Sequence, residues 1–244
     1  MEINTVDRSV SQGTMTAVQT AEGLRVFMAN VFSWMTAALV ITAFVSYWFA
    51  SNESLFSMLH SPEGGSTILG WVVMLAPLGF VLAMGAAFEK LSYQMMMLLF
   101  IAFAVVMGIS MSYIFHVYTA GSIYKTFFIT AGTFGIMAFV GYTTKTDLTS
   151  FGKILFMGLI GIILASVVNW FIGSSSLDYI ISIIGVLVFT GLTAYDVQRL
   201  KNIGATVENG TSFAGKAAIM GALALYLDFI NLFLMLLRLF GSRD

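Results

Sequence analysis

The amino-acid sequence predicts an all-α integral membrane protein with seven transmembrane helices. Of its 244 residues, 59% are hydrophobic and 9% are charged, with 22 Phe, 16 Met and 2 Pro. The apolar residues are gathered into long runs, and short polar turns separate these runs. Because a helix needs about 20 mostly apolar residues to cross a hydrocarbon core of roughly 30 Å, each long run predicts one span.

Seven apolar runs follow one another along the chain. They are Phe27–Ala50, Thr67–Phe88, Gln94–Phe115, Thr126–Tyr142, Phe151–Ile172, Tyr179–Gln198 and Ala217–Phe240. Turn-forming residues such as Ser61–Gly65 and Gly173–Ser176 join them. The sequence therefore predicts a single transmembrane domain over residues 27–244, with no second soluble domain.

The first 26 residues are polar and mixed in charge. They lack the basic start, apolar centre and small-residue cleavage site of a signal peptide. We therefore expect residues 1–26 to form a retained cytoplasmic tail that is disordered or loosely helical.

The distribution of Lys and Arg predicts the orientation, because positive charge is retained on the cytoplasmic side of a membrane. With the N-terminus inside, eight basic residues fall in inner segments and three in outer segments. The inner set is Arg8, Arg25, Lys90, Lys145, Lys153, Arg199, Lys201 and Lys216, and the outer set is Lys125, Arg238 and Arg243. Two of the outer residues lie in the C-terminal tail, so a re-entrant last helix that returns this tail to the cytoplasm stays open as an alternative.

Composition also excludes several classes of function. A net charge of −1 and the lack of a basic run give no reason to expect nucleic-acid binding. The chain has no cysteine, which rules out disulfides, thiol catalysis and iron–sulfur clusters. We expect no cofactor, and we do not expect an enzyme.

Asp228 stands in the middle of the last apolar run and is the first functional signal. A carboxylate near the centre of a spanning helix costs about 2.5–3.5 kcal/mol on insertion scales, so it needs a proton, water or a partner. Asn231 follows one helical turn later, and Gly221 and Ala224 allow a neighbouring helix to approach that face. Arg238 lies roughly 15 Å further along the axis, too far to neutralise Asp228, so we expect it to snorkel to the membrane surface.

Asp196 lies near the cytoplasmic end of the sixth run, with Arg199 three residues later. It either pairs with Arg199 at the interface or faces Asp228 across the last two helices. In the second arrangement the two carboxyl groups would hold a proton between them, respond to pH, and offer oxygen ligands to Ca²⁺ when deprotonated. Helix rise places Asp196 only about 5 Å deep and Asp228 roughly 18 Å deep, but the last run is long enough to project beyond the bilayer and reduce this difference.

Two stretches resemble the bacterial inner-membrane branch of the Bax inhibitor-1, or transmembrane Bax inhibitor motif, family. They are Gly191-Leu-Thr-Ala-Tyr-Asp-Val-Gln198 and the long segment Leu225–Gly241, and Gly141–Gly152 is similar to the loop between the fourth and fifth helices of bacterial members. The resemblance implies a central seventh helix surrounded by two three-helix layers. It also implies a pH-sensitive calcium leak whose di-aspartyl sensor is Asp196 with Asp228.

The sequence departs from some bacterial relatives at the second helix. Those relatives carry a carboxylate there and an arginine cluster at its end, whereas Thr67–Phe88 has no charge and is followed only by Glu89 and Lys90. Lys90 or Arg199 is then left as the group that latches onto the aspartates.

Two other classes of function stay open. The first is a regulatory membrane protein that binds membrane partners such as a quality-control protease, in which the N-terminal tail would matter. The second, weaker alternative is an intramembrane aspartyl protease, whose accompanying motifs are absent from the sequence.

Overall fold

The structure is a computed structural model that describes residues 3–61 and 65–243. Its regular elements, within these ranges, are all helical. They are α1 (Ile3–Ala50), α2 (Glu53–Leu59), α3 (Ile68–Ala86), α4 (Tyr93–Met111), α5 (Ile114–Val117), α6 (Ala120–Thr143), α7 (Thr149–Ile172), α8 (Ser175–Gly204) and α9 (Ser212–Phe240).

Seven helical stretches in the described part of the chain are long and apolar enough to cross a membrane, so the predicted number of spans is confirmed. The stretches are Ala21–Ala50, Ile68–Ala86, Tyr93–Val117, Ala120–Thr143, Thr149–Ile172, Ser175–Gly204 and Ser212–Phe240. The short helices α2 and α5 were not predicted, because each lies in a connection beside a longer apolar run.

Hydroxyl side chains fix where several of the spans begin. An N-cap oxygen accepts a backbone N–H that has no partner within the helix, which favours a helix start at that position. This role is taken by Thr67, Ser92, Thr119, Ser174 and Thr211. Several helices therefore begin at polar residues that precede the apolar runs predicted from the sequence.

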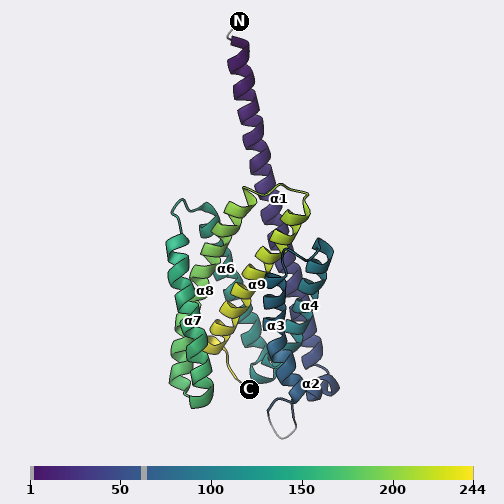
Figure 1. The fold of residues 1–244 in the computed structure, drawn as a ribbon. Helices are drawn as coiled ribbons and strands as arrows, with labels where there is room; N and C mark the ends of the chain where they lie inside the picture. Colours follow the sequence, from purple (N-terminus) through teal and green to yellow (C-terminus); the bar gives the residue numbers. More distant parts are fainter. Residues whose placement is uncertain (1–2, 62–64, 244) are drawn as a thin grey trace.

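The helix α9 is the most buried span, with 72% of its most apolar stretch buried inside the molecule. It packs against α1, α4, α6 and α8. The helices α3 and α7 are the least buried, at 11% each, and they pack mainly against α4 and α8 respectively. Figure 1 shows α9 crossing the bundle obliquely, with α7 on one side of it and α3 on the other.

A buried polar contact joins α9 to two other helices. The hydroxyl oxygens of Tyr226 and Thr42 are 2.7 Å apart, and Thr42 donates to the carbonyl of Ala104 at 2.9 Å. Tyr226 is fully buried, and its ring meets Phe103 edge-on with centroids 5.3 Å apart. Polar groups inside a membrane need such internal partners, so this contact fixes α9 against α1 and α4.

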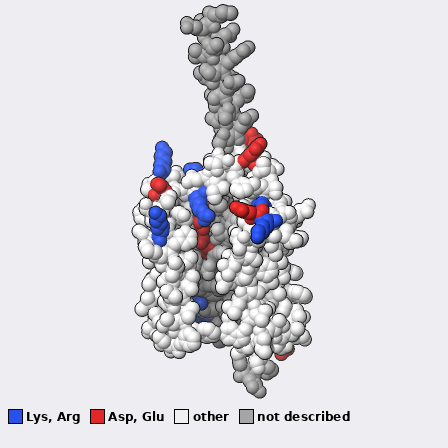
Figure 2. All heavy atoms as spheres, viewed as in Figure 1, with Lys and Arg blue, Asp and Glu red and all other residues white. Residues whose placement is uncertain are grey.

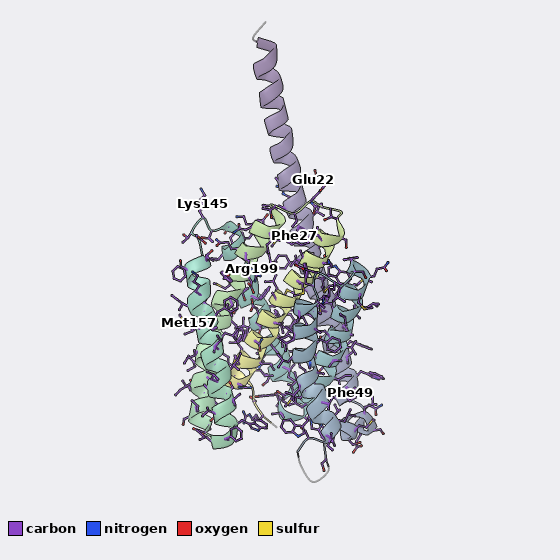
Figure 3. The ribbon with its side chains drawn as sticks, in the orientation of Figure 1. Glu22, Phe27, Phe49, Lys145, Met157 and Arg199 are labelled. Carbon is purple, nitrogen blue, oxygen red and sulfur yellow. The ribbon has the colours of Figure 1, made fainter. Side chains whose placement is uncertain are left out.

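The two ends of the described chain lie at opposite ends of the bundle (Figure 1). Figure 3 places Glu22 and Lys145 toward the N-terminal end and Phe49 toward the other. The tail expected at residues 1–26 is helical from Ile3 and continuous with the first span. Because α9 is one unbroken helix of 29 residues between the two ends, it gives no support to the re-entrant alternative.

Candidate functional site

The structure brings Asp196 of α8 and Asp228 of α9 together inside the bundle. Their exposed fractions are 7% and 5%, and their side chains lie close enough to interact electrostatically. Oδ1 of Asp196 and Oδ2 of Asp228 are buried and accept no hydrogen bond from the described residues. Two ionised carboxylates are both acceptors and repel one another, so a proton shared between them would stabilise this arrangement.

The path of α9 explains how the two aspartates meet despite their different places along their helices. The helix begins at Ser212, five residues before the predicted start at Ala217, and it crosses the bundle obliquely (Figure 1). A tilted helix gains less depth per residue, so Asp228 lies nearer to Asp196 than the helix rise alone predicts.

Arg199, one turn after Asp196, pairs with that aspartate. Its Nη1 lies 3.7 Å from Oδ1 of Asp196, and its side chain is 56% exposed while that of Asp196 is 10% exposed. Figure 3 shows Arg199 in the upper part of the bundle, beside α9. Both arrangements considered for Asp196 are therefore present together: it faces Asp228 and it pairs with Arg199.

Two hollows meet at Asp196 and Arg199, which line both of them. The first, of about 770 Å³, opens between α3, α8 and α9 toward the N-terminal end, and its charged lining is Glu89, Lys90, Asp196 and Arg199. The second, of about 730 Å³, is an apolar groove between α3 and α7 whose polar lining is Ser166, Asp196, Arg199, Asp228 and Asn231. Figure 2 shows the molecule hollowed along its middle, with acidic atoms recessed below basic ones.

The other residues singled out from the sequence take different places. Lys90 is exposed and lines the first hollow, on the same rim as Arg199. Asn231 lines the groove next to Asp228, and its Nδ2 donates to the carbonyl of Leu227 at 2.8 Å. Arg238 is exposed in the last turn of α9, away from the aspartates.

Lys216 is part of the surroundings of the site that sequence reasoning missed. Its exposed fraction is 9%, and its Nζ donates to the carbonyls of Phe88 and Leu91 at 2.9 and 3.0 Å. The ammonium also lies 4.9 Å from the centroid of the Phe88 ring. Lys216 thus holds the α3–α4 connection, which carries Glu89 and Lys90, against α9. In the sequence, a lone lysine at the start of an apolar run predicted only which side of the membrane this end of the helix faces.

Gln198 was also missed as a contributor, although it belongs to the motif that contains Asp196. Its Oε1 accepts from the N–H of Leu148 and its Nε2 donates to the carbonyl of Thr146, each at 2.8 Å. Lys201, one turn later, donates to the carbonyl of Tyr142 at 2.8 Å. The α6–α7 connection is therefore tied to the same end of α8 that presents Asp196 and Arg199.

Asp147 stabilises the α6–α7 connection through a hydrogen bond to a neighbouring backbone group. Its Oδ1 accepts from the backbone N–H of Thr149 at 2.9 Å, at the start of α7. Hydrogen bonds from the side chain and backbone of Thr149 hold the pKa of Asp147 below its usual value. The carboxylate therefore stays ionised around neutral pH at the positive end of a helix.

Known proteins resemble this chain over nearly its whole length. The family model described as "Inhibitor of apoptosis-promoting Bax1" matches residues 24–244. The chain belongs to the Bax inhibitor-1 family. This membership confirms the resemblance carried by the stretches around Asp196 and Asp228, and it identifies the chain as a membrane protein.

Three bacterial relatives illustrate the family match. Inner membrane protein YbhL of Escherichia coli K12 is 48% identical over 227 residues, which cover 93% of this chain and 95% of the relative. An uncharacterized protein of Borreliella burgdorferi is 44% identical, covering 89% and 92%. An uncharacterized protein of Deinococcus radiodurans is 40% identical, covering 97% and 99%.

Proposed function

We propose that this Bax inhibitor-1 family protein is a pH-sensitive calcium leak of the bacterial inner membrane, with Asp196 and Asp228 as its proton sensor. The observation that carries the proposal is the buried carboxyl pair at the junction of the two hollows. Ionisable groups inside a membrane are expensive to bury, so they are usually retained for proton or ion movement.

The sensor acts by shifting the populations of two helix arrangements. While the pair holds a proton, the two carboxyl groups can stay side by side without like-charge repulsion, which keeps α8 and α9 together at this depth. Loss of the proton leaves two like charges side by side, which favours an arrangement in which the groups separate. The two hollows then join or part according to the protonation of the pair.

Calcium is the cargo in this proposal and is not a resident cofactor. Within the described residues no three His, Cys, Asp or Glu side chains cluster as a metal site. Ca²⁺ takes 6–8 oxygen ligands, more than two carboxylates and one amide supply, so the ion would keep part of its water. Weak, partly hydrated coordination suits an ion that must also leave.

Lys90 and Arg199 are the latch in this proposal. Both line the first hollow, and Arg199 lies 3.7 Å from Asp196. A positive charge at this mouth opposes the entry of a cation and attracts the nearer aspartate when that group is ionised. Movement of Arg199 away from Asp196 would therefore accompany opening.

We also propose how the spans are arranged around α9, in which membrane the protein lies and on which side its N-terminus stands. A central α9 surrounded by two layers of three spans is supported by its burial and by its contacts with α1, α4, α6 and α8. A bacterial inner-membrane location is supported by the similarity to the E. coli inner membrane protein YbhL. A cytoplasmic N-terminus is supported by the excess of Lys and Arg in the segments on that side.

Calcium flux into proteoliposomes tests the leak. We expect wild-type flux to change several-fold between mildly acidic and mildly alkaline pH, and we expect Asp228→Asn to remove this dependence. Asp178→Asn is the matched control, because Asp178 lies exposed in the first turn of α8. Equal, pH-independent flux through wild type and Asp228→Asn would remove the pair from the mechanism.

A regulatory protein that binds membrane partners, such as a quality-control protease, is the second candidate. It is favoured by α1, which begins at Ile3, well before the apolar run that starts at Phe27. Deletion of residues 1–20 should then abolish chemical cross-linking to a membrane protease in cells and leave calcium flux intact. Unchanged cross-linking would reject this candidate.

A further inference from the structure

Two tryptophans meet between α3 and α7, the helices that form two walls of the apolar groove. Trp71 lies in the first turn of α3 and Trp170 in the last turn of α7. Their ring centroids are 5.3 Å apart and the ring planes are inclined by 40°. This contact joins the two helices that form the walls of the groove.

The tryptophans lie on the same helix faces that line the groove. Trp71 precedes the lining residue Leu78 by two helical turns, and Trp170 follows the lining residue Val167 by one turn. The groove lining ends at Pro77 on α3 and at Val167 on α7, and the two rings lie beyond these residues on the same faces, toward the end of the bundle opposite the N-terminus. A path that left the groove along these faces would therefore meet the two rings.

The two walls are otherwise held by different neighbours. The helix α3 packs mainly on α4, and α7 packs mainly on α8, and both are the least buried spans. Trp71 and Trp170 are 37% and 67% exposed. A half-exposed aromatic contact between two peripheral helices is weak enough to open and close without disturbing the core.

We propose that Trp71 and Trp170 are the outer closure of the groove that leads from the aspartate pair. The inference rests on the proposed leak, because a closure matters only if ions use the groove. Two apolar rings in contact exclude water and a hydrated cation, as hydrophobic constrictions do in other channels. The closure is thus a second barrier, in series with the carboxyl pair.

The contact can be tested apart from any flux. The chain has no cysteine, so Trp71→Cys/Trp170→Cys carries the only thiols, and a short bifunctional methanethiosulfonate reagent can bridge them reversibly. The control is Trp48→Cys/Trp170→Cys, since Trp48 is a 54% exposed tryptophan on α1. We expect intramolecular bridging of the first pair in proteoliposomes and little bridging of the second. Equal bridging of both pairs would overturn the closure.

Calcium flux then tests whether the contact bars the path. Bridging of Trp71→Cys/Trp170→Cys should lower the flux several-fold, and a reductant should restore it. Trp71→Ala/Trp170→Ala should raise the flux several-fold at the pH at which wild type is least active, whereas Trp71→Phe/Trp170→Phe should stay closer to wild type.

The outcomes separate this inference from the proposed sensor. If bridging forms but leaves the flux unchanged, and the alanine pair behaves as wild type, the tryptophans are membrane-interface anchors and the closure is overturned. If Asp228→Asn keeps the pH response while bridging still blocks flux, the sensor fails and the closure stands. If wild type carries no flux at any pH and the alanine pair carries none either, both proposals fail.

Discussion

Lys216 is a buried cation whose partners are all neutral. Its Nζ donates to the carbonyls of Phe88 and Leu91, and the Phe88 ring covers the ammonium. Carbonyls just beyond the end of a helix carry partial negative charge, which stabilises a cation there. A lysine that would be expensive to bury alone therefore becomes the group that fixes the α3–α4 connection.

Substitution of Lys216 should reduce stability more than substitution of an exposed lysine. Lys216→Met keeps the apolar stem but leaves two carbonyls without this donor, which costs about 1–3 kcal/mol. Reversible unfolding in mixed detergent micelles measures the difference. Lys153→Met, at an exposed position on α7, is the control and should change stability by less than about 0.5 kcal/mol. Equal losses would mean that the carbonyl contacts are not what Lys216 contributes.

Residue types alone indicated the two aspartates but not the residues that support them. Asp196 and Asp228 stand out because a carboxylate in an apolar run is unusual and needs an explanation. Lys216 and Gln198 bond to backbone groups that are distant in sequence, at separations of 128 and 52 residues for Phe88 and Thr146. No local pattern marks such a contact, so only the packed structure could show it.

At the scale of helices, α6 and α8 approach closely where Gly141 faces the backbone of Ala194. A side chain at Gly141 would strike the carbonyl group of Ala194, which belongs to a packed helix and cannot move alone. Small residues at such points let helix backbones come together in a membrane. The end of α8 that carries Asp196 is therefore positioned partly by the missing side chain of Gly141.

Gly141→Ala should push α6 away from α8. We expect a loss of about 1–3 kcal/mol in unfolding free energy, as for other overpacked sites. Gly135→Ala is the matched control on the same helix, since nothing lies within 4 Å of the added methyl group. The control should be neutral or more stable by up to about 1 kcal/mol, because alanine favours helix more than glycine does. Equal effects of the two substitutions would contradict a close contact at Gly141.

The α6–α7 connection should become more mobile when Gln198 is shortened. Gln198→Ala removes two hydrogen bonds to the backbone of Thr146 and Leu148. We expect faster amide hydrogen exchange over residues 144–149 than in wild type, because local openings of this connection then need less free energy. Gln94→Ala, at an exposed position in the first turn of α4, should leave exchange there unchanged. Unaltered exchange in Gln198→Ala would show that other contacts hold the connection.

The sequence predicted the number and order of the spans because apolar runs of sufficient length are a strong signal. For some spans, however, the predicted first residue lies later in the chain than the observed start of the helix. The sixth span was expected from Tyr179 but begins at Ser175, where Ser174 accepts from the N–H of Leu177. The fourth was expected from Thr126 but begins at Ala120, where Thr119 is the cap. Polar first turns belong to these helices, and an apolar pattern does not include them.

For the whole molecule, the decisive arrangement is the oblique path of α9 through the bundle. This path lets Asp228, in the middle of one span, meet Asp196 near the end of another (Figure 1). Sequence reasoning could permit the pair but could not require it, because helix tilt depends on packing against neighbouring helices. The contact between Trp71 and Trp170 could not be predicted from the sequence for the same reason.

The orientation of the whole molecule can be decided with single cysteines, since the natural chain has none. Lys145 lies toward the N-terminal end of the bundle (Figure 3), whereas Glu53 lies in the first turn of α2, which Figure 1 places at the opposite end. Because positive charge is retained in the cytoplasm, we expect the end with Lys145 to face inward.

A membrane-impermeant thiol reagent should then label Glu53→Cys in intact spheroplasts and should label Lys145→Cys only after the membrane is permeabilised. Both variants should react fully in detergent, which controls for accessibility. The reverse pattern in spheroplasts would invert the topology and place the hollow that contains Lys90 and Arg199 on the outer face.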